Sequence, residues 1–414
     1  MKVQLAFIAV FVGTFAKAKG KIAIDTCDRI LQHGYPCETH KVTTSDGYVL
    51  TLFRIPKSSP NRNDTQNATM QFPVLVTHCL ACTSDIFVVS GPNDGLPFLL
   101  SNAGFDVWLA NARGNIYSQE HTFLSPFSVE YWDFSLDEIG RIDVPANTDY
   151  ILKTTNRTKI HYIGYSQGAA VIMILLSTNP SYAEIAKSVH LLAPPIYMCH
   201  IKTPLVSMLA EILGQPGAFA DFFGTFPSQG VTAVLRLLGH NICNNQRNHI
   251  VCMVFANLFS GWGSPYLNTT LLPDLLLSTP SDVSNRQYNQ FLQFVKTCEF
   301  KAYDFGAKGN LLKYGTPKPP AYDLVNMNTM EPIEVYFADN DNMVSLDTTR
   351  HFHRVMGGRC NWNRVKLEKY NHFDFALATN VGECINKCLV GKLQKYEDQP
   401  FDENMCKCFI NTAF

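Results

Sequence analysis

The fold of this chain is decided by residues 160–173, which read IHYIGYSQGAAVIM. The segment opens with an apolar, β-branched and aromatic run, Ile160 to Ile163, which predicts a buried strand. A Gly-x-Ser-x-Gly turn follows at Gly164–Gly168, and helix-forming residues begin at Ala169. A strand, this turn and a helix in succession lift a serine above the edge of a sheet, so Ser166 is predicted to be a nucleophile.

Strand-like and helix-like segments alternate on both sides of this turn. The runs predicted as strands are 74–78, 106–111, 160–164, 189–192, 333–337 and 365–367. Helical spacing of apolar residues fills 95–103, 136–152 and 167–177. This alternation predicts an α/β fold whose mostly parallel central sheet is covered by helices on both faces.

The alternation stops after Pro194-Pro195 and resumes near Glu331, which predicts an insertion over the sheet. Inside it, a helix is predicted to begin at Thr203-Pro204 and to end before Gly214. One face of that helix is apolar, and more apolar residues follow; together they are Leu205, Met208, Leu209, Ile212, Val231, Val234, Leu235, Leu238, Leu271, Leu272 and 275–277. The helix face could pack on the core or form the underside of a lid. The total apolar surface favours a lipid substrate over a polar one.

The first residues predict a secretory signal peptide. Lys2 precedes an apolar run from Val3 to Phe15, and Ala16-Lys17-Ala18 offers the small residues that a signal peptidase accepts. About 13 apolar residues are too few for a membrane span, which needs roughly 20. We therefore expect residues 1–18 to be removed, with no transmembrane segment in the mature chain.

Four Asn-x-Ser/Thr sequons agree with secretion, because each is a possible glycosylation site in a secreted protein. Their asparagines are Asn63, Asn67, Asn156 and Asn268. A chain of 414 residues with 46% hydrophobic composition can bury a large core, and its net charge of −1 gives no electrostatic preference for nucleic acid.

Thirteen cysteines, all beyond the signal segment, predict disulfides, and the odd count leaves at least one cysteine unpaired. Cys243 and Cys252 bracket a short polar segment and could close a loop, as could Cys27 and Cys37. Four cysteines crowd the C-terminal tail and allow three pairings: Cys384, Cys388, Cys406 and Cys408. A metal site is the alternative, but the tail lacks Cys-x-x-Cys hooks, which favours two disulfides.

A serine nucleophile needs an imidazole to take its proton and a carboxylate to orient that imidazole. In a strand-turn-helix arrangement of this kind, the chain order is serine, acid, histidine. His372 follows the predicted strand 365–367 and precedes a helical run, which makes it the candidate base. The acid should follow strand 333–337, where Asp339, Asp341 and Asp347 are available and position slightly favours the first two.

Two backbone N–H groups are also needed to bind the oxyanion of the tetrahedral intermediate. One comes from the residue after the nucleophile, which is Gln167. The other comes from a loop after an earlier strand. Here Thr77-His78-Cys79-Leu80 ends the first predicted strand, so the Leu80 amide is the candidate.

The chain resembles the acid lipase family of α/β-hydrolases, which includes lysosomal acid lipase and gastric lipase. The similarity runs through nearly the whole mature chain and is carried by residues 34–36, 44–50, 54–56, 104–115, 134–140, 303–306 and 371–375. The most specific of these stretches is Asn111-Ala112-Arg113-Gly114-Asn115. The family pattern places the nucleophile on Ser166, the acid on Asp341 and the base on His372. The spacing of Cys243 and Cys252 also resembles the family's disulfide.

The resemblance implies an α/β-hydrolase fold with a largely helical cap. We expect a hydrolase core at 19–198 and 311–414, a cap or lid at 199–310, and a cysteine-rich tail. It implies a secreted or lysosomal serine lipase that acts on triacylglycerol or cholesteryl ester at a lipid–water interface, with no metal or organic cofactor. The alternatives are an esterase for small soluble esters and a weakly active or inactive lipid-binding or storage protein.

Three positions depart from the family pattern. Cys79 stands where the family has glycine, so a thiol must fit beside the oxyanion donor, at a cost of roughly 1 kcal/mol if the position needs positive φ. Tyr165 replaces the common histidine, and we expect its side chain to point away from the nucleophile without affecting the chemistry. Residues 280–284 replace a Pro-Ala-Gly-Thr-Ser-like stretch and are expected to alter lid contacts.

Overall fold

The computed structural model describes residues 24–56, 71–199, 201–217, 223–224, 229–245 and 248–411. The predicted signal segment, 1–18, and the sequons of Asn63 and Asn67 lie outside these residues. Of the two described sequon asparagines, Asn156 is exposed and Asn268 is half-buried, and their glycosylation stays a prediction. No helix in the described ranges is long and apolar enough to cross a membrane.

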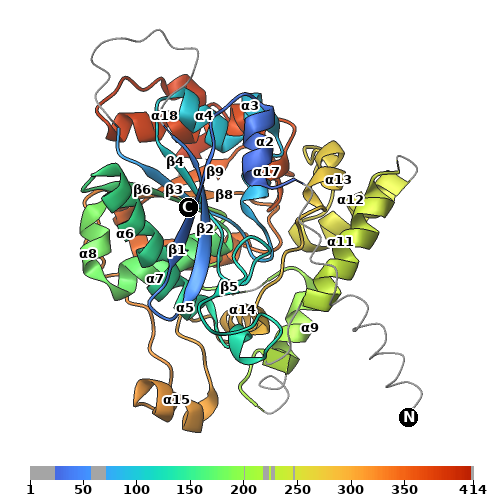
Figure 1. The fold of residues 1–414 in the computed structure, drawn as a ribbon, viewed down its shortest axis with the longest axis vertical. Helices are drawn as coiled ribbons and strands as arrows, with labels where there is room; N and C mark the ends of the chain where they lie inside the picture. The colour runs from blue at the N-terminus through green and yellow to red at the C-terminus, as the bar shows by residue number, and fades with distance from the viewer. Residues whose placement is uncertain are drawn as a thin grey trace.

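A ten-stranded sheet runs through the described part of the chain (Figure 1). Its strands are β1 (Glu38–Thr43), β2 (Tyr48–Ile55), β3 (Val74–Thr77), β4 (Val107–Ala110), β5 (Glu120–His121), β6 (Ile160–Tyr165), β7 (Ala186–Leu192), β8 (Ile333–Phe337), β9 (Cys360–Val365) and β10 (Phe409–Asn411). The spatial order is β1-β2-β4-β3-β6-β7-β8-β9-β10, with β5 paired to β2. The six strands from β4 to β9 pair in parallel, and β1, β2 and β10 are antiparallel.

Five of the six predicted strands are confirmed within a few residues. The sixth prediction, 365–367, was wrong because β9 ends at Val365 rather than beginning there. This strand carries Asn361, Asn363 and Arg364, so its composition does not look like a buried strand. It is held by pairing with β8 on one side and β10 on the other.

Two helical layers cover the sheet. One consists of α5 (Leu136–Glu138), α6 (Val144–Thr155), α7 (Gln167–Thr178), α8 (Pro180–Ile185) and α16 (Leu346–Met356). The other includes α2 (Thr26–Gln32), α4 (Leu96–Asn102), α17 (Asp374–Leu377) and α18 (Lys387–Tyr396), with the short α3 (Gly91–Asp94) beside α4. Side chains along each strand alternate between the two cores: Leu75 belongs to the first, and its neighbours Val74 and Val76 belong to the second.

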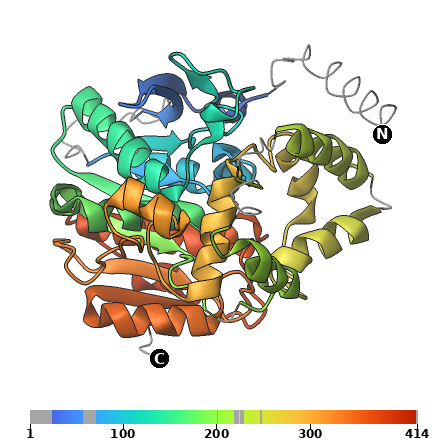
Figure 2. The same ribbon diagram turned by 90° about the horizontal axis from the view of Figure 1, so that it is seen from below.

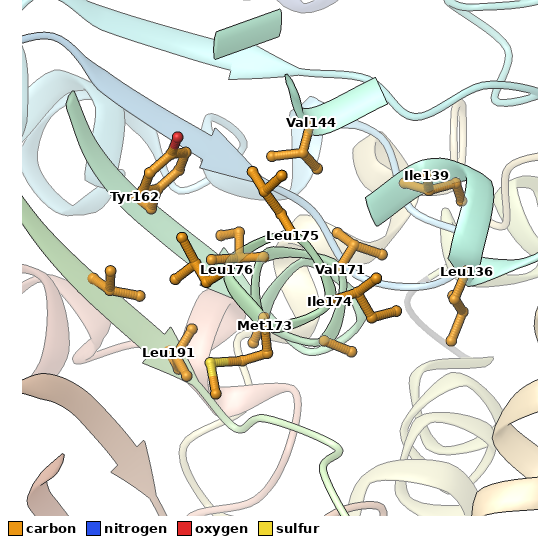
Figure 3. Close-up of a cluster of buried hydrophobic side chains, with 14 of the residues drawn as sticks. Leu136, Ile139, Val144, Tyr162, Val171, Met173, Ile174, Leu175, Leu176 and Leu191 are labelled. Atoms are coloured by element: carbon orange, nitrogen blue, oxygen red, sulfur yellow. The ribbon is translucent and has the colours of Figure 1, made fainter. Parts of the chain in front are cut away.

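Helix α7 is the centre of the first core. Residues 167–176 are all buried, as expected for a helix that is apolar on every side. Figure 3 shows Val171 and Ile174 of α7 beside Leu136 and Ile139, from the chain that leads into α6, and Val144, the first residue of α6. Packing on all sides fixes the position of α7, and with it the turn that precedes the helix.

The segment between β7 and β8 is mostly helical, and Figure 2 shows its yellow-green helices to one side of the sheet. The helices of the whole segment are α9 (Pro204–Leu213), α11 (Gln229–Cys243), α12 (His249–Ser260), α13 (Leu272–Leu275), α14 (Asn285–Thr297) and α15 (Gly306–Tyr314). Helix α9 begins and ends as predicted. Its buried residues, Ala210 and Leu213, pack with Leu292 of α14.

Many apolar side chains of this insertion face solvent. We call the following set the exposed apolar surface: Met208, Ile212, Val231, Val234, Leu235, Leu237, Leu238, Ile250, Val251 and Trp262. Met208 and Ile212 belong to the face of α9 for which core packing was one interpretation; they are 55% and 52% exposed, so that interpretation is wrong for these two residues.

The structure pairs twelve of the thirteen cysteines. The disulfides are Cys27–Cys37, Cys79–Cys82, Cys199–Cys298, Cys243–Cys252, Cys384–Cys408 and Cys388–Cys406. Cys360 is the free thiol that the odd count required, and its burial raises its pKa. Over the described residues, no group of three or more His, Cys, Asp or Glu side chains is arranged to hold a metal ion.

Candidate active site

Ser166 forms the turn between β6 and α7. The strand ends at Tyr165 and the helix begins at Gln167, so the serine alone changes the direction of the chain. Its backbone has φ 53° and ψ −117°, a conformation that residues with a Cβ rarely adopt. Such strain persists only where the surroundings hold it, and here a buried strand and a buried helix do so.

The two glycines of the turn allow the close packing that this geometry needs. A Cβ on Gly164 would lie 2.6 Å from the Ala169 nitrogen, and a Cβ on Gly168 would lie 2.3 Å from the Thr77 carbonyl oxygen. No side chain fits at either distance. The second contact also brings the end of β3 against the first turn of α7, beside Gln167.

The predicted nucleophile, base and acid are joined by hydrogen bonds. His372 Nε2 lies 2.9 Å from Ser166 Oγ, and His372 Nδ1 lies 2.7 Å from Asp341 Oδ2. All three side chains are buried, and Ser166 is 9% exposed. With Asp341 ionised, the Nδ1–H donates to the carboxylate, which leaves Nε2 free to accept the serine proton.

The structure distinguishes among the three carboxylates that sequence position allowed. Asp341 Oδ1 accepts the backbone N–H groups of Met343 at 2.8 Å and Val344 at 2.7 Å, so its Oδ2 is aimed at His372. Asp339 pairs with Arg364. The exposed Asp347 pairs with its helix neighbour Arg350 instead.

The two candidate oxyanion donors lie in segments that meet at Gly168. Neither the Leu80 N–H nor the Gln167 N–H has a hydrogen-bond acceptor in the described part of the chain. The Gln167 N–H also stands at the N-terminus of α7, where the helix dipole favours negative charge. Both amides are therefore available to an anionic oxygen.

Cys79 does not present a free thiol beside Leu80, because it is bonded to Cys82. The residue with positive φ in this loop is Ala81, at 56°, rather than Cys79. The expectation that a thiol must be accommodated next to the oxyanion donor was therefore wrong. Sequence reasoning counted the cysteines but did not pair these two.

His78 connects this loop to the Asn111–Asn115 stretch. Its Nδ1 lies 2.8 Å from the Cys79 carbonyl oxygen, and its Nε2 lies 3.1 Å from both the Ala112 backbone nitrogen and the Asn115 side-chain nitrogen. Burial lowers the pKa of His78 to about 4. The ring is thus neutral, donates from Nδ1 and accepts at Nε2.

Arg113, which belongs to the same stretch, anchors it through its side chain. Its buried guanidinium donates to Asp143 at 2.6 and 2.8 Å and to Asp46 at 2.6 and 3.1 Å, and it stacks on the Tyr48 ring. Such planar, bidentate contacts are specific to arginine. The most specific stretch of the family resemblance therefore supports the loop after β3.

Tyr165 contacts the candidate base. Its buried hydroxyl donates to the His372 carbonyl oxygen at 2.8 Å, and the two rings are 5.5 Å apart between centroids. That Tyr165 leaves the chemistry untouched stays a prediction, although its hydroxyl contacts the backbone of the candidate base. The pentapeptide alone could not show this, since residues 165 and 372 meet only in the folded chain.

The end of α12 joins the acid and base loops. The Ser260 carbonyl oxygen accepts from the backbone N–H of His372 at 3.2 Å and from that of Asn342 at 3.3 Å. Asn371 Nδ2 donates to the Gly261 carbonyl oxygen at 3.0 Å. No sequence pattern predicted this contact, because Ser260 carries no chemical signature and acts through its backbone.

Residues 280–284 connect the insertion to the core. The Ser281 N–H donates to the Ala81 carbonyl oxygen at 2.6 Å. Asp282 accepts from Gln119 at 2.7 Å and lies 3.6 Å from Arg236 of α11. These positions depart from the family pattern, and they contact both α11 of the insertion and the loop after β3.

Asp374, two residues after the candidate base, predicts a pH-dependent stability. Burial raises the pKa of its carboxyl group from 3.8 to about 6, opposed by hydrogen bonds from Ser264 and the Asn371 N–H. Both bonds go to Oδ2, and the buried Oδ1 has no hydrogen-bond partner among the described residues. The folded state therefore binds a proton more tightly than the unfolded state. The stability from this group is present below pH 4 and is lost as pH rises to 6.

We expect Asp374→Asn to remove this dependence, because the amide keeps an oxygen at Oδ2 and does not titrate. The free energy of unfolding of the wild type, relative to the variant, should fall by roughly 2 kcal/mol between pH 4 and pH 7. Urea unfolding at several pH values measures the difference. The surface variant Asp347→Asn serves as control, and a wild-type-to-Asp374→Asn difference that stays constant with pH would contradict the prediction.

Comparison with known proteins agrees with the fold. A model of the α/β hydrolase fold matches residues 72–379, and a model of the partial α/β-hydrolase lipase region matches residues 26–91. An esterase structure from Exiguobacterium antarcticum has a TM-score of 0.50 and 12% identity, covering 86% of this chain and 100% of that one. That likeness concerns the fold alone.

Similarity in sequence extends over most of the chain. Lipase 3 of Drosophila melanogaster is 33% identical over 91% of this chain and 95% of its own. Gastric triacylglycerol lipase of Bos taurus is 34% identical over 89% and 90%, and that of Homo sapiens is 30% identical over 91% and 92%. With these matches, the chain belongs to the acid lipase family of α/β-hydrolases.

Proposed function

We propose that this protein is a secreted or lysosomal serine lipase that hydrolyses the ester bonds of triacylglycerol or cholesteryl ester. The observation that carries the proposal is the hydrogen-bonded series Asp341, His372 and Ser166, together with the Leu80 and Gln167 N–H groups, which have no acceptor among the described residues. The matched relatives named gastric triacylglycerol lipase support the substrate class.

In the first half of the reaction, Ser166 Oγ attacks the ester carbonyl carbon while His372 Nε2 takes the hydroxyl proton. Asp341 stabilises the imidazolium that forms. The carbonyl oxygen becomes an oxyanion and accepts hydrogen bonds from the Leu80 and Gln167 amides. The carbon–oxygen ester bond then breaks, His372 gives its proton to the leaving alkoxide, and an acyl group remains on Ser166.

In the second half, water enters the position that the alcohol has left. His372 Nε2 removes a proton from this water, and the resulting hydroxide attacks the acyl carbon. The same two amides stabilise the second oxyanion. When the acyl–oxygen bond to Ser166 breaks, the proton on His372 returns to the serine oxygen, and a fatty acid is released.

We further propose that residues 199–310 form a cap that opens at a lipid–water interface. Two observations support this: Ser166 is only 9% exposed, and the exposed apolar surface lies on the insertion. Extensive exposed apolar surface is typical of a membrane or lipid interaction site. Opening of such a cap would expose Ser166 where the substrate is concentrated.

A double variant of the exposed apolar surface, Val231→Ser with Leu238→Ser, tests this proposal. These side chains are 66% and 52% exposed, so their replacement should leave the fold intact. Fully burying one such side chain stabilises by about 1.5–3 kcal/mol. Even partial insertion of two predicts at least a tenfold lower rate on an emulsified long-chain ester. Hydrolysis of a dissolved short-chain ester should be unchanged.

The matched control is Leu312→Ser on α15, which removes an apolar side chain that is 83% exposed outside that surface. It should leave both rates unchanged. Equal rates on emulsified ester for the double variant and the wild type would contradict the interfacial role. They would instead favour an esterase for small soluble esters.

A further inference from the structure

The Leu80 N–H belongs to the peptide group that Cys79 and Leu80 share. A peptide group is planar and trans, so its N–H points opposite to its C=O, and fixing one fixes the other. The Cys79 carbonyl oxygen accepts from His78 Nδ1 at 2.8 Å and from the Cys82 N–H at 3.2 Å. These two donors therefore set the direction of the Leu80 N–H.

One of the two donors is brought into place by a disulfide. Cys79 and Cys82 are bonded across the turn, with their Cα atoms 5.2 Å apart, and the Cys82 N–H closes the same turn on the Cys79 carbonyl. Both cysteines are buried, at 4% and 5% exposure. The covalent link thus keeps the donor and the carbonyl together.

The turn needs such a link because the backbone of one of its residues has an unfavourable conformation. Ala81 has φ 56°, in the left-handed region that costs a residue with a Cβ about 1 kcal/mol or more. An open loop could relieve that cost by rotating its peptide groups. The disulfide restricts the alternatives, and the Ser281 N–H holds the Ala81 carbonyl oxygen at 2.6 Å from the other side.

We propose that the Cys79–Cys82 disulfide is a positioning element of the oxyanion hole. It contacts no reacting atom; it acts by fixing the peptide plane that carries the Leu80 N–H. The inference rests on the proposed role of that amide as oxyanion donor. It assigns Cys79 and Cys82 a function distinct from the other five disulfides, none of which includes a residue of this turn.

The test is the double variant Cys79→Ala/Cys82→Ala, which removes the link without leaving an odd thiol. We expect kcat on a dissolved short-chain ester to fall by about ten- to hundredfold with little change in KM, since loss of a whole donor costs about a hundred- to thousandfold. Affinity for a trifluoromethyl ketone, which forms a tetrahedral oxyanion on the serine, should fall by a similar factor. The variant's urea midpoint reports stability separately.

The matched control is Cys27→Ala/Cys37→Ala, which removes a disulfide that closes a short loop at α2. It should retain wild-type kcat and ketone affinity, whatever its urea midpoint. The inference is overturned if Cys79→Ala/Cys82→Ala keeps wild-type kcat and ketone affinity, or if the control loses both equally. Ser166→Ala distinguishes the two proposals. An active Ser166→Ala protein overturns the proposed function itself. If Ser166→Ala is inactive, the comparison of the two disulfide variants tests only the positioning role of Cys79–Cys82.

Discussion

Ser166→Ala should lower kcat on both dissolved and emulsified esters by roughly ten-thousandfold or more. The hydroxyl is the only group in the hydrogen-bonded series that can form the acyl intermediate, and His372 Nε2 is placed 2.9 Å from it to take its proton. Alanine removes the oxygen and leaves the strained turn, the buried helix and the two amides in place. The residual rate would come from substrate binding and the oxyanion donors.

A second serine on the same helix provides the control. Ser177→Ala removes a hydroxyl that donates to the Ile174 carbonyl oxygen at the far end of α7. Its kcat should match the wild type within about twofold, because a surface change away from the site is nearly neutral. If Ser166→Ala hydrolysed short-chain esters at the wild-type rate, the assignment of the nucleophile would be refuted.

The second large effect is expected from Asp341→Asn, with kcat lowered by about a thousand- to ten-thousandfold. Asp341 Oδ1 accepts two backbone N–H groups, so the amide oxygen of asparagine must take that position. Its NH2 group then faces His372 Nδ1. The imidazole is forced to carry its proton on Nε2, where it can no longer accept the proton of Ser166.

Asp339→Asn is the control for this prediction, because Asp339 lies two residues away and pairs with Arg364 on the surface. Single-turnover measurements with a chromogenic ester should show slow acylation in Asp341→Asn and normal acylation in Asp339→Asn. A large loss in Asp339→Asn together with a near-normal rate in Asp341→Asn would exchange their proposed roles.

The central part of the fold could be predicted because local signals there agree with the tertiary structure. Strand β6, the glycine turn and helix α7 each follow from residues next to one another in the chain. Strand β9 could not be predicted in the same way, since the pairing that holds it comes from β8 and β10. Polar residues such as Asn363 lie in that strand because its neighbours, not its composition, determine it.

In the candidate site, too, some features follow from local sequence and others from tertiary contacts. Gly164 and Gly168 mark the nucleophile turn because backbone sterics leave no room for a side chain, and this requirement is visible in the sequence. The choice of Asp341 over Asp339 was not visible in the sequence, because position along the chain allowed both residues. In the fold, two backbone N–H groups aim Asp341 at His372, while Arg364 holds Asp339 away.

By itself, the sequence determined the α/β architecture, the candidate nucleophile and base, and an odd number of cysteines, because these depend on residue type and short-range spacing. Tertiary structure alone decided that Tyr165 supports His372, that Ser260 joins the acid and base loops, and that Cys79 is bonded to Cys82. The physical reason is that such contacts depend on where hydrogen-bond donors and carbonyl oxygens meet in space. The spacing of residues along the chain does not reveal which of these groups come into contact.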